Sequence, residues 1–298
     1  GYLGRSSLRH PPLVMGHEFS GEVVALDPSD EGGPIAVGQL VAVNPILPCR
    51  NCPTCAAGRY QICPNRTLIG AQRPGAFADL VAAPLTALVP LPDGTSPVLG
   101  ALTEPFATAL HAARLGGLTA DDGVIVWGAG SIGLLAIWAA LLSGAGRVVA
   151  VDTNPQRLRA AEEMGAVAAI DGGADDAVAA ARAALGDVRR TVVLEAVGRT
   201  ASRQAAVEAA GPGGTVVLIG LHDAETSLPI NAMIRAEIAL FCSYAYRPEE
   251  FRDAARILAH EPLPTTSWIA TRPLTEGAAS FAELIDRPGA ATKIVLEP

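Results

Sequence analysis

Four of the five cysteines lie close together, with the spacing of a metal site. The run is C-x2-C-x2-C-x7-C, and its members are Cys49, Cys52, Cys55 and Cys63. Four thiolates so placed can enclose one tetrahedral Zn²⁺ with no open coordination position, which makes such a site structural. A ferredoxin-like iron–sulfur cluster is the alternative, because C-x2-C-x2-C also occurs there. The long spacing to the fourth cysteine and the flanking β pattern favour zinc.

A second group of possible ligands is the pair His17 and Glu18, which opens an alternating, strand-like segment over 19–24. Neutral imidazole is a common zinc ligand, and an adjacent carboxylate can tune such a site. Glu104 stands directly before Pro105, at the expected first position of a helix. Both features also have an ordinary interpretation, since His-Glu occurs in turns and a glutamate at a helix N-terminus is a favourable charge.

A glycine motif predicts a dinucleotide site. Residues 124–142 read VIVWGAGSIGLLAIWAALL, which indicates a buried strand, a glycine turn and a buried helix. The turn holds G-x-G-x-x-G at Gly128, Gly130 and Gly133, where a pyrophosphate would meet a helix N-terminus. The first glycine permits the tight turn, the second lets phosphate approach, and the third lets helix and strand pack closely. A turn that binds nothing and a membrane span are the weaker alternatives, because glycines interrupt the apolar run.

Asp152 indicates which cofactor this turn would bind. It ends a second apolar strand, nineteen residues after Gly133. A carboxylate at that place accepts both hydroxyls of an adenosine ribose and repels a 2′-phosphate. The sequence therefore predicts NAD rather than NADP.

The elements that position these residues alternate between strands and helices from Gly123 onward. Strands are predicted at Val124–Trp127, Val148–Asp152, Ala168–Ile170, Thr191–Glu195, Val216–Ile219 and Ile238–Ser243. Helices are predicted at Pro155–Met164, Ala174–Leu185, Ser202–Ala210 and Pro248–Ala259. This order predicts a doubly wound parallel sheet, with Cys242 packed in the core of its last strand.

Shorter segments flank this sheet on both sides. The strand-like segments Gln39–Val43 and Ala76–Ala82, between turns rich in Gly and Pro, predict a compact β domain. The tail after Pro264 contains one helix near Gly277–Ile285 and a final strand from Lys293. This is too little for a separate domain, so we expect the tail to fold back onto the first domain.

Composition limits the class of protein and its partners. The chain has 298 residues, of which 50% are apolar and 17% charged, as in a globular protein. A net charge of −8 argues against a nucleic-acid partner, which needs a basic face. No export or membrane-anchoring pattern is recognised, so we expect a cytoplasmic protein without a membrane partner. In that setting clustered thiols indicate metal rather than disulfides.

Together these motifs resemble the zinc-dependent alcohol dehydrogenases of the medium-chain dehydrogenase/reductase superfamily, in the branch of the sorbitol, threonine and butanediol dehydrogenases. The resemblance spans essentially the whole chain in family order. Its features are G-H-E at 16–18, the four-cysteine loop, T-E-P at 103–105, the glycine motif with Asp152, E-A-V-G at 195–198 and K-I-V-L at 293–296.

The resemblance implies an α/β protein with a Rossmann domain between the two parts of a GroES-like β domain. Residues 1–98 would form the GroES-like catalytic domain, N-terminally incomplete, with a structural zinc lobe at 48–64. Residues 99–264 would form the NAD-binding domain, and 265–298 would return to the catalytic domain.

The resemblance also implies roles for single residues. His17 and Glu104 would hold a catalytic zinc, with Glu18 as a neighbouring or exchangeable ligand. Cofactor contacts would come from Gly128, Gly130, Ser131, Ile132, Gly133, Asp152, Arg157, Val197 and Lys293, the last of these near the pyrophosphate. The implied reaction is hydride transfer between NAD and a secondary alcohol or polyol, including sugar-derived or aminocyclitol alcohols, in a homodimer or homotetramer.

One family feature has no counterpart in these 298 residues. The C-G-[ST]-D segment, which carries a further zinc-ligand cysteine and starts the proton relay, is expected upstream of G-H-E. We therefore expect a chain that lacks its N-terminal segment. An inactive relative that keeps NAD and the structural zinc is the alternative, and on either interpretation these 298 residues are predicted to oxidise alcohols poorly.

Overall fold

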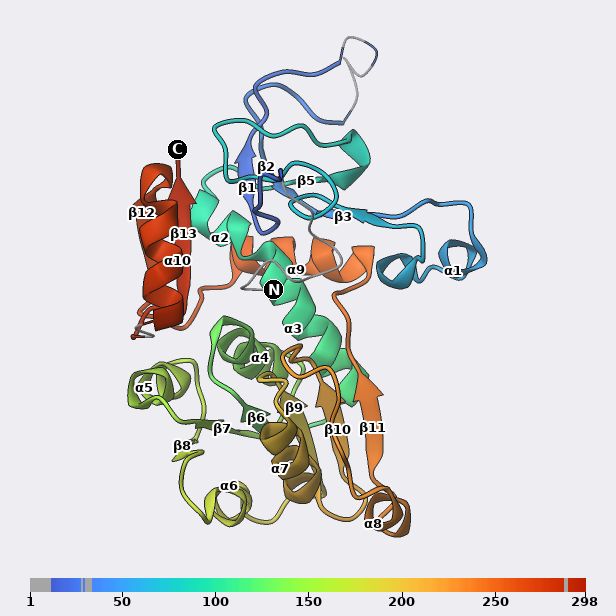
Figure 1. Cartoon of the computed structure of the whole chain (residues 1–298), viewed down its shortest axis with the longest axis vertical. Helices are drawn as coiled ribbons and strands as arrows, with labels where there is room; N and C mark the ends of the chain where they lie inside the picture. Colours follow the sequence, from blue (N-terminus) through green and yellow to red (C-terminus); the bar gives the residue numbers. More distant parts are fainter. Residues whose placement is uncertain (1–11, 28, 30–33, 287–288) are drawn as a thin grey trace.

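The structure is a computed structural model that describes residues 12–27, 29, 34–286 and 289–298. Expectations about the first eleven residues lie outside this range. In Figure 1 a sheet with its helices occupies the lower half, and smaller β elements occupy the upper half. The two halves correspond to the predicted Rossmann and GroES-like parts.

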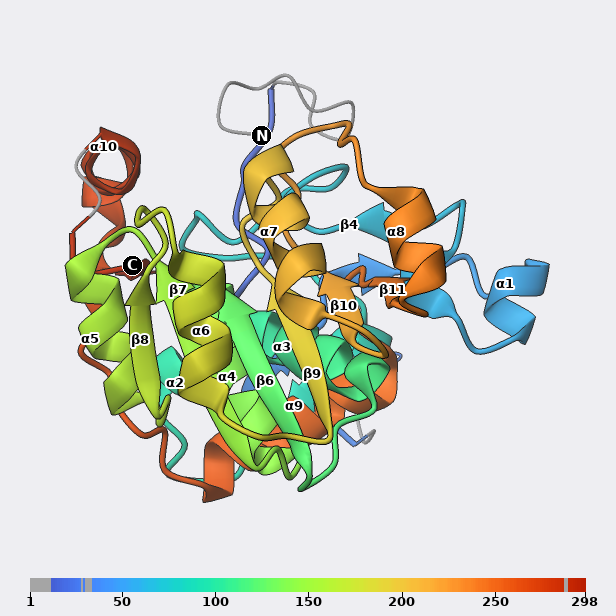
Figure 2. The same cartoon turned by 90° about the horizontal axis from the view of Figure 1, so that it is seen from below.

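Six parallel strands form the central sheet, in the order β11-β10-β9-β6-β7-β8 (Figure 2). Their bounds are β6 Asp122–Trp127, β7 Arg147–Asp152, β8 Ala168–Asp171, β9 Arg190–Glu195, β10 Thr215–Leu218 and β11 Ala239–Cys242. The chain runs from β6 to β7 and β8, and then returns past β6 to β9. This confirms the predicted doubly wound sheet, whose ligands bind at the carboxyl ends of the strands beside that reversal.

Helices cover both faces of the sheet. Their bounds are α3 Thr103–Gly116, α4 Ser131–Leu142, α5 Pro155–Glu163, α6 Ala177–Leu185, α7 Thr200–Ala210, α8 Ile230–Arg235 and α9 Pro248–His260. In β6, Val124 and Val126 face a core shared with α3, α4 and α9, whereas Ile125 and Trp127 face a core shared with α6 and α7. Burial on both faces explains the almost wholly apolar strand sequences. Among the described residues, no helix is long and apolar enough to cross a membrane.

The first domain is built on a small antiparallel sheet in the order β1-β2-β5. The bounds are β1 Ser20–Glu22, β2 Leu40–Val43 and β5 Leu88–Pro90, while β3 Ile46–Leu47 pairs with β4 Thr67–Leu68. The four-cysteine loop contains α1 Pro53–Ala56 and η2 Tyr60–Ile62, and η3 Leu85–Ala87 and α2 Pro97–Ala101 follow. This domain has its own apolar core around Phe19, Val41 and Ile69.

The predicted strand Ala76–Ala82 is wrong. The segment is irregular in the structure, and the amides of Ala76 and Phe77 donate to the carbonyl oxygens of Gly16 and Met15. These bonds join the segment to the residues before His17 instead of to a sheet. A Cβ on Gly16 would lie 2.8 Å from the Phe77 nitrogen, so this close approach requires glycine. The segment therefore fixes the backbone that leads into His17.

The C-terminal segment contains a strand that the sequence did not reveal. β12 Ile269–Pro273 pairs in parallel with β13 Lys293–Glu297, and η4 Leu274–Glu276 and α10 Gly277–Asp286 connect them. Two contacts join this segment to the first domain, as the predicted return requires. The Phe281 ring packs edge-on against Phe77 with centroids 5.8 Å apart, and Lys293 forms an ion pair with Glu18.

Two local predictions are corrected. Cys242 is exposed instead of packed in the core, because β11 is the edge strand of the sheet and all four of its residues are exposed. The helix that carries Glu104 begins at Thr103, so Pro105 is its third residue instead of its first.

Candidate metal and nucleotide sites

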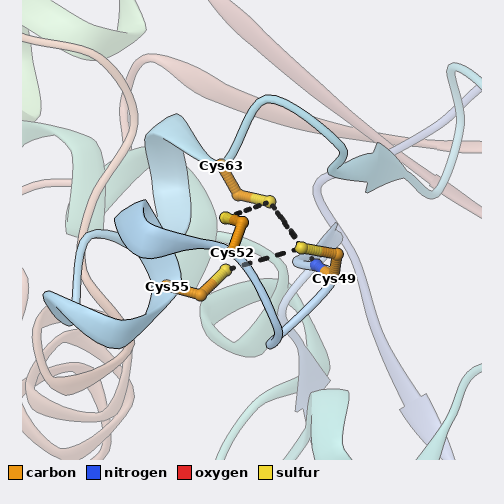
Figure 3. Close-up of side chains that lie close together, drawn as sticks. All are labelled: Cys49, Cys52, Cys55 and Cys63. Atoms are coloured by element: carbon orange, nitrogen blue, oxygen red, sulfur yellow. Dashed lines mark hydrogen bonds between the residues drawn. The ribbon is translucent and has the colours of Figure 1, made fainter.

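The side chains of the four cysteines converge on one point, as Figure 3 shows. The sulfur–sulfur distances are 3.5 Å for Cys49–Cys63, 3.8 Å for Cys52–Cys63 and 4.0 Å for Cys49–Cys55. A tetrahedron with Zn–S bonds of about 2.3 Å has edges of about 3.8 Å, so these positions fit one zinc ion. They are too far apart for disulfides, whose S–S bond is about 2.05 Å.

The pKa values of these thiols differ from one cysteine to another. A hydrogen bond from the Asn51 backbone lowers the pKa of Cys49 to about 6. Burial raises the pKa of Cys55 to about 12. The protein alone thus leaves the thiols unequally ionised, whereas coordination to a divalent cation makes every ligand a thiolate.

His17, Glu18 and Glu104 form the second cluster. Their ligand atoms lie within 4.8 Å of one another, and His17 Nε2 is 3.9 Å from Glu18 Oε1. His17 and Glu18 precede β1, whereas Glu104 is the second residue of α3, a helix that packs against the sheet. One imidazole and two carboxylates are suitable zinc donors. The fold thus brings the three predicted catalytic residues together from two domains.

The charges in this cluster favour a metal ion. Burial raises the pKa of Glu104 to about 7, and the nearby Tyr246 hydroxyl opposes this rise. Lys293 forms an ion pair with Glu18, and burial lowers the pKa of its ammonium group to about 8. Two carboxylates close together in a partly buried position repel each other, and a divalent ion between them would relieve this repulsion.

The glycine turn has the geometry that a nucleotide site requires. Gly128 has a φ of 97°, in the left-handed region that favours glycine. A Cβ on Gly133 would collide with the carbonyl oxygen of Gly128, so α4 can approach β6 only with glycine there. A Cβ on Gly130, the N-cap of α4, would meet no atom within 4 Å. The space before this helix N-terminus is therefore open to a phosphate.

Asp152 lies at the end of β7, beside this turn. Its Oδ2 accepts a hydrogen bond from the Ala129 amide at 2.7 Å, and its Oδ1 accepts one from the Asn154 amide at 2.8 Å. The carboxylate is thus held in place and keeps lone pairs for ribose hydroxyls. Nearby, Val197 packs over Gly128. Arg157 lies in the first turn of α5, and its buried Nε has no hydrogen-bond partner among the described residues.

One cavity connects the two predicted sites. Its volume is about 1,420 Å³, and its lining includes His17, Glu18, Ser131 and Lys293. Ser131 and Ile132 form the first turn of α4, directly after the glycine turn. Two of the predicted metal-site residues, His17 and Glu18, and one residue of the predicted nucleotide turn, Ser131, therefore border a common space. Lys293, which is predicted to lie near a pyrophosphate, forms an ion pair with Glu18 in this cavity.

Sequence reasoning missed Tyr246, which follows β11 and is 1% exposed. Its hydroxyl lies close enough to Glu104 to affect the pKa of that carboxyl group, but makes no hydrogen bond of normal geometry within the described residues. A tyrosine between a strand and a helix carries no motif, and only the fold reveals its neighbour.

Two family models match this chain. The one described as "Alcohol dehydrogenase GroES-like domain" matches residues 2–93, and "Zinc-binding dehydrogenase" matches residues 131–260. L-galactonate-5-dehydrogenase of Escherichia coli (strain K12) is 34% identical, over 83% of this chain and 72% of its own length. Galactitol 1-phosphate 5-dehydrogenase of the same strain is 31% identical, over 99% of this chain and 87% of its own length.

Solved structures of similar proteins have the same fold. A zinc-binding dehydrogenase from Sinorhizobium meliloti 1021, bound to NADP, aligns with a TM-score of 0.88 and 32% identity, over 97% of this chain and 85% of its own. Galactitol-1-phosphate dehydrogenase from Escherichia coli aligns with a TM-score of 0.89 and 29% identity, over 98% of this chain and 86% of its own. These matches confirm the Rossmann and GroES-like architecture and support zinc and a nicotinamide cofactor. The chain belongs to the zinc-dependent alcohol dehydrogenase family of the medium-chain dehydrogenase/reductase superfamily.

Proposed function

We propose that the protein transfers hydride between NAD and a polyol or other secondary alcohol, at a zinc site formed by His17, Glu18 and Glu104. The observation that carries this proposal is the convergence of the three side chains within 4.8 Å. Two of them line the cavity that also reaches Ser131 at the glycine turn. A metal ligand set and a nucleotide turn that share one cavity are the arrangement that a metal-assisted dehydrogenase needs.

Each residue of the proposed site would have a separate role. His17 and Glu104 would hold the zinc, with Glu18 as a neighbouring or exchangeable carboxylate. When bound, zinc acts as a Lewis acid that lowers the pKa of the substrate hydroxyl, while the redox chemistry belongs to NAD. Lys293 would balance part of the charge of Glu18 and hold its carboxylate beside His17.

A preference for NAD over NADP is inferred from Asp152. The relative from Sinorhizobium meliloti was bound to NADP, so family membership alone does not decide between the cofactors. The carboxylate of Asp152 is fixed beside the glycine turn by the amides of Ala129 and Asn154. A 2′-phosphate placed there would meet a negative charge, whereas two ribose hydroxyls would find an acceptor.

The substrate class is inferred from the relatives. Their names specify L-galactonate, galactitol 1-phosphate and, for a protein of Bacillus subtilis (strain 168) that is 32% identical, sorbitol. All three molecules carry several neighbouring hydroxyl groups. We therefore expect a polyol or a sugar-derived alcohol to be oxidised faster than a simple secondary alcohol.

We also propose a homodimer, with a homotetramer as the alternative. β11 is an edge strand on which Leu240 and Phe241 are 37% and 41% exposed, and Ile234 of the neighbouring α8 is 67% exposed. An exposed apolar strand edge has unpaired backbone groups that a second copy of the same strand can satisfy.

The predicted domain division and location remain part of this proposal. β1 to β5 precede residue 98, the six-stranded sheet lies within 99–264, and β12 and β13 follow 265, which supports the three proposed ranges. Cysteines arranged for a metal instead of disulfides suit a reducing compartment, which supports the cytoplasm.

The test is an initial-rate assay of the protein in its natural length with NAD and a panel of sorbitol, galactitol, galactonate and 2-butanol. His17→Ala should lower kcat by about a thousandfold or more, because the metal contributes several kcal/mol to catalysis. It should also lower the zinc content. His260→Ala, at an exposed histidine in the last turn of α9, is the matched control and should change neither. Wild-type turnover by His17→Ala would reject the proposed site.

A further inference from the structure

A second cavity lies between the four-cysteine loop and the start of α9. Its volume is about 290 Å³. Its lining includes Arg50, Tyr60 and Gln61 of the loop, Tyr246 just before α9, and Glu249 and Arg252 in the first turns of α9. His17, Glu18 and Glu104 are not among its lining residues. The cavity is therefore distinct from the proposed catalytic site.

Buried polar groups line this cavity without satisfying one another. Gln61 is 4% exposed and Tyr246 is 1% exposed. Gln61 Oε1 has no hydrogen-bond partner in the part of the chain that the structure describes, and the Tyr246 hydroxyl, although close to Glu104, forms no hydrogen bond of normal geometry there. A buried polar group without a partner is unfavourable, and it usually marks a place for water, an ion or a ligand. The cavity thus has donors and acceptors available at its buried end.

The charges at the cavity favour an anion. Arg50 and Arg252 both line it, and neither guanidinium forms an ion pair with a carboxylate of the described residues. Arg50 lies over the Tyr60 ring, 6.0 Å from its centroid. Glu249 is the single carboxylate in the lining. The lining therefore carries two positive side chains and one negative side chain. The cavity is locally positive, although the net charge of the whole chain is −8. A guanidinium group binds carboxylate and phosphate with paired hydrogen bonds.

We propose that this cavity binds a small anion that carries hydroxyl groups, such as a sugar acid or a sugar phosphate. Its carboxylate or phosphate would accept hydrogen bonds from Arg50 and Arg252, and its hydroxyl groups would pair with Gln61 and Tyr246. The cavity is at the lower end of the range of about 300–1,000 Å³ for ligand pockets, so the ligand must be compact.

This inference goes beyond the proposed reaction, because it assigns a binding role to the four-cysteine loop. Arg50 lies between Cys49 and Cys52, and Gln61 lies two residues before Cys63, so metal bound by these cysteines would fix one wall of the cavity. The opposite wall includes Tyr246, which lies next to Glu104. One side chain therefore separates the anion site from the catalytic cluster.

The experiment is calorimetric titration of the zinc-loaded protein with three probes: D-gluconate, inorganic phosphate and neutral sorbitol. Gluconate or phosphate should bind in a manner that depends on Arg50 and Arg252, whereas sorbitol, which lacks the charge that the guanidinium groups recognise, should bind only at the proposed catalytic site. Arg50→Gln and Arg252→Gln should each weaken anion binding at least about tenfold. Arg59→Gln is the matched control, since Arg59 is an exposed residue of the same loop that does not line the cavity.

The comparison of gluconate with phosphate identifies which anionic group the site prefers. Absence of binding by both anions, sorbitol binding that Arg50→Gln and Arg252→Gln weaken as much as they weaken anion binding, or anion binding that these variants leave unchanged would each overturn the proposal. The titration is repeated with His17→Ala, where anion binding should persist. Failure of the proposed catalytic function is thereby distinguished from failure of the anion site.

Discussion

The carboxylate of Asp152 accepts a 2.7 Å hydrogen bond from the amide of Ala129, the residue between the first two glycines of the turn. The group that would contact the ribose is thus bonded directly to the loop that would contact the pyrophosphate. One part of the predicted cofactor site comes from β7 and the other from the β6–α4 turn. This hydrogen bond holds the two parts in position relative to each other.

Asp152→Asn should reduce the preference for NADH over NADPH by about tenfold or more. Asparagine keeps an acceptor for the Ala129 amide but removes the charge that repels a 2′-phosphate. Binding of both cofactors by fluorescence titration checks this. Asp171→Asn, at the end of the neighbouring β8, is the matched control and should leave the ratio unchanged. Tighter binding of NADPH than NADH by the wild type would contradict the assignment.

Two glycines of the same turn should respond differently to alanine. Gly133→Ala should lower the free energy of unfolding by about 3 kcal/mol or more, because its methyl group collides with the Gly128 carbonyl. Gly130→Ala should fold normally, since its methyl group meets open space, yet bind NADH about tenfold more weakly, because the phosphate needs that space. Urea unfolding and NADH titration of both variants test the pair. Normal NADH affinity in Gly130→Ala would place the pyrophosphate elsewhere.

Cys52→Ser should lose the structural zinc and lower the free energy of unfolding by at least about 3 kcal/mol, because metal bound only by the folded state adds its binding energy to stability. Zinc analysis and thermal unfolding measure the two effects. Cys242→Ser should alter neither, because Cys242 is an exposed residue of the edge strand. Full zinc content in Cys52→Ser would show that the four cysteines do not act as one site.

Glu104→Gln should change how the stability of the zinc-free protein depends on pH. Burial raises the pKa of Glu104 from its ordinary 4.5 to about 7, so the folded protein keeps a proton that the unfolded chain releases. The contribution of Glu104 to the free energy of unfolding is therefore complete below about pH 4.5, falls as the pH rises to about 7, and changes no further once both states are deprotonated. Glu104→Gln should lose this part of the pH dependence of the free energy of unfolding, because glutamine does not titrate. Urea unfolding with a chelator at about pH 5 and about pH 8 measures it.

The matched control for this measurement is Glu162→Gln, at an exposed residue of α5, which should keep the pH dependence of the wild type. The same dependence in Glu104→Gln and in the wild type would show that Glu104 titrates as an ordinary carboxyl group.

Asp122→Asn should destabilise the protein by about 1.5–3 kcal/mol without weakening NADH binding. The carboxylate of Asp122 is 0% exposed and accepts hydrogen bonds from Arg189 and Arg190, which are 57% and 24% exposed, so the substitution removes charge-assisted hydrogen bonds at a buried acceptor. Asp122 begins β6, at the opposite end from the glycine turn. Asp121→Asn, at its exposed neighbour, should have little effect in the same urea titration. A loss of NADH affinity in folded Asp122→Asn would mean that the two ends of β6 are coupled.

Much of this fold follows from local patterns. The strands of the central sheet are predicted within one or two residues because burial on both faces requires apolar runs, and glycine turns and helix starts separate them. The four-cysteine site is predicted in full, since all its ligands lie in one short loop. These are features whose physical cause is contained within a few neighbouring residues.

Features that depend on distant contacts were not predictable. Ala76–Ala82 has a strand-like composition, but its backbone bonds to the residues before His17, which no local pattern reveals. The short β12 is defined by pairing with β13 twenty residues later. Exposure of Cys242 depends on which strand forms the sheet edge, and the position of Tyr246 near Glu104 depends on how α3 and α9 pack.

The attachment of α3 to the sheet has a mechanical consequence for the metal cluster. At its C-terminal end, the carbonyl oxygens of Gly116 and Gly117 accept hydrogen bonds from Arg190, which is paired with Asp122 of β6. Glu104, at the other end of this 14-residue helix, therefore moves with the sheet, whereas His17 moves with the first domain. Any hinge rotation between the two bodies changes the separation of these two ligands. A metal ion bound by both Glu104 and His17 would resist such a rotation. Closure of the two bodies around a cofactor would therefore change the coordination of that metal ion.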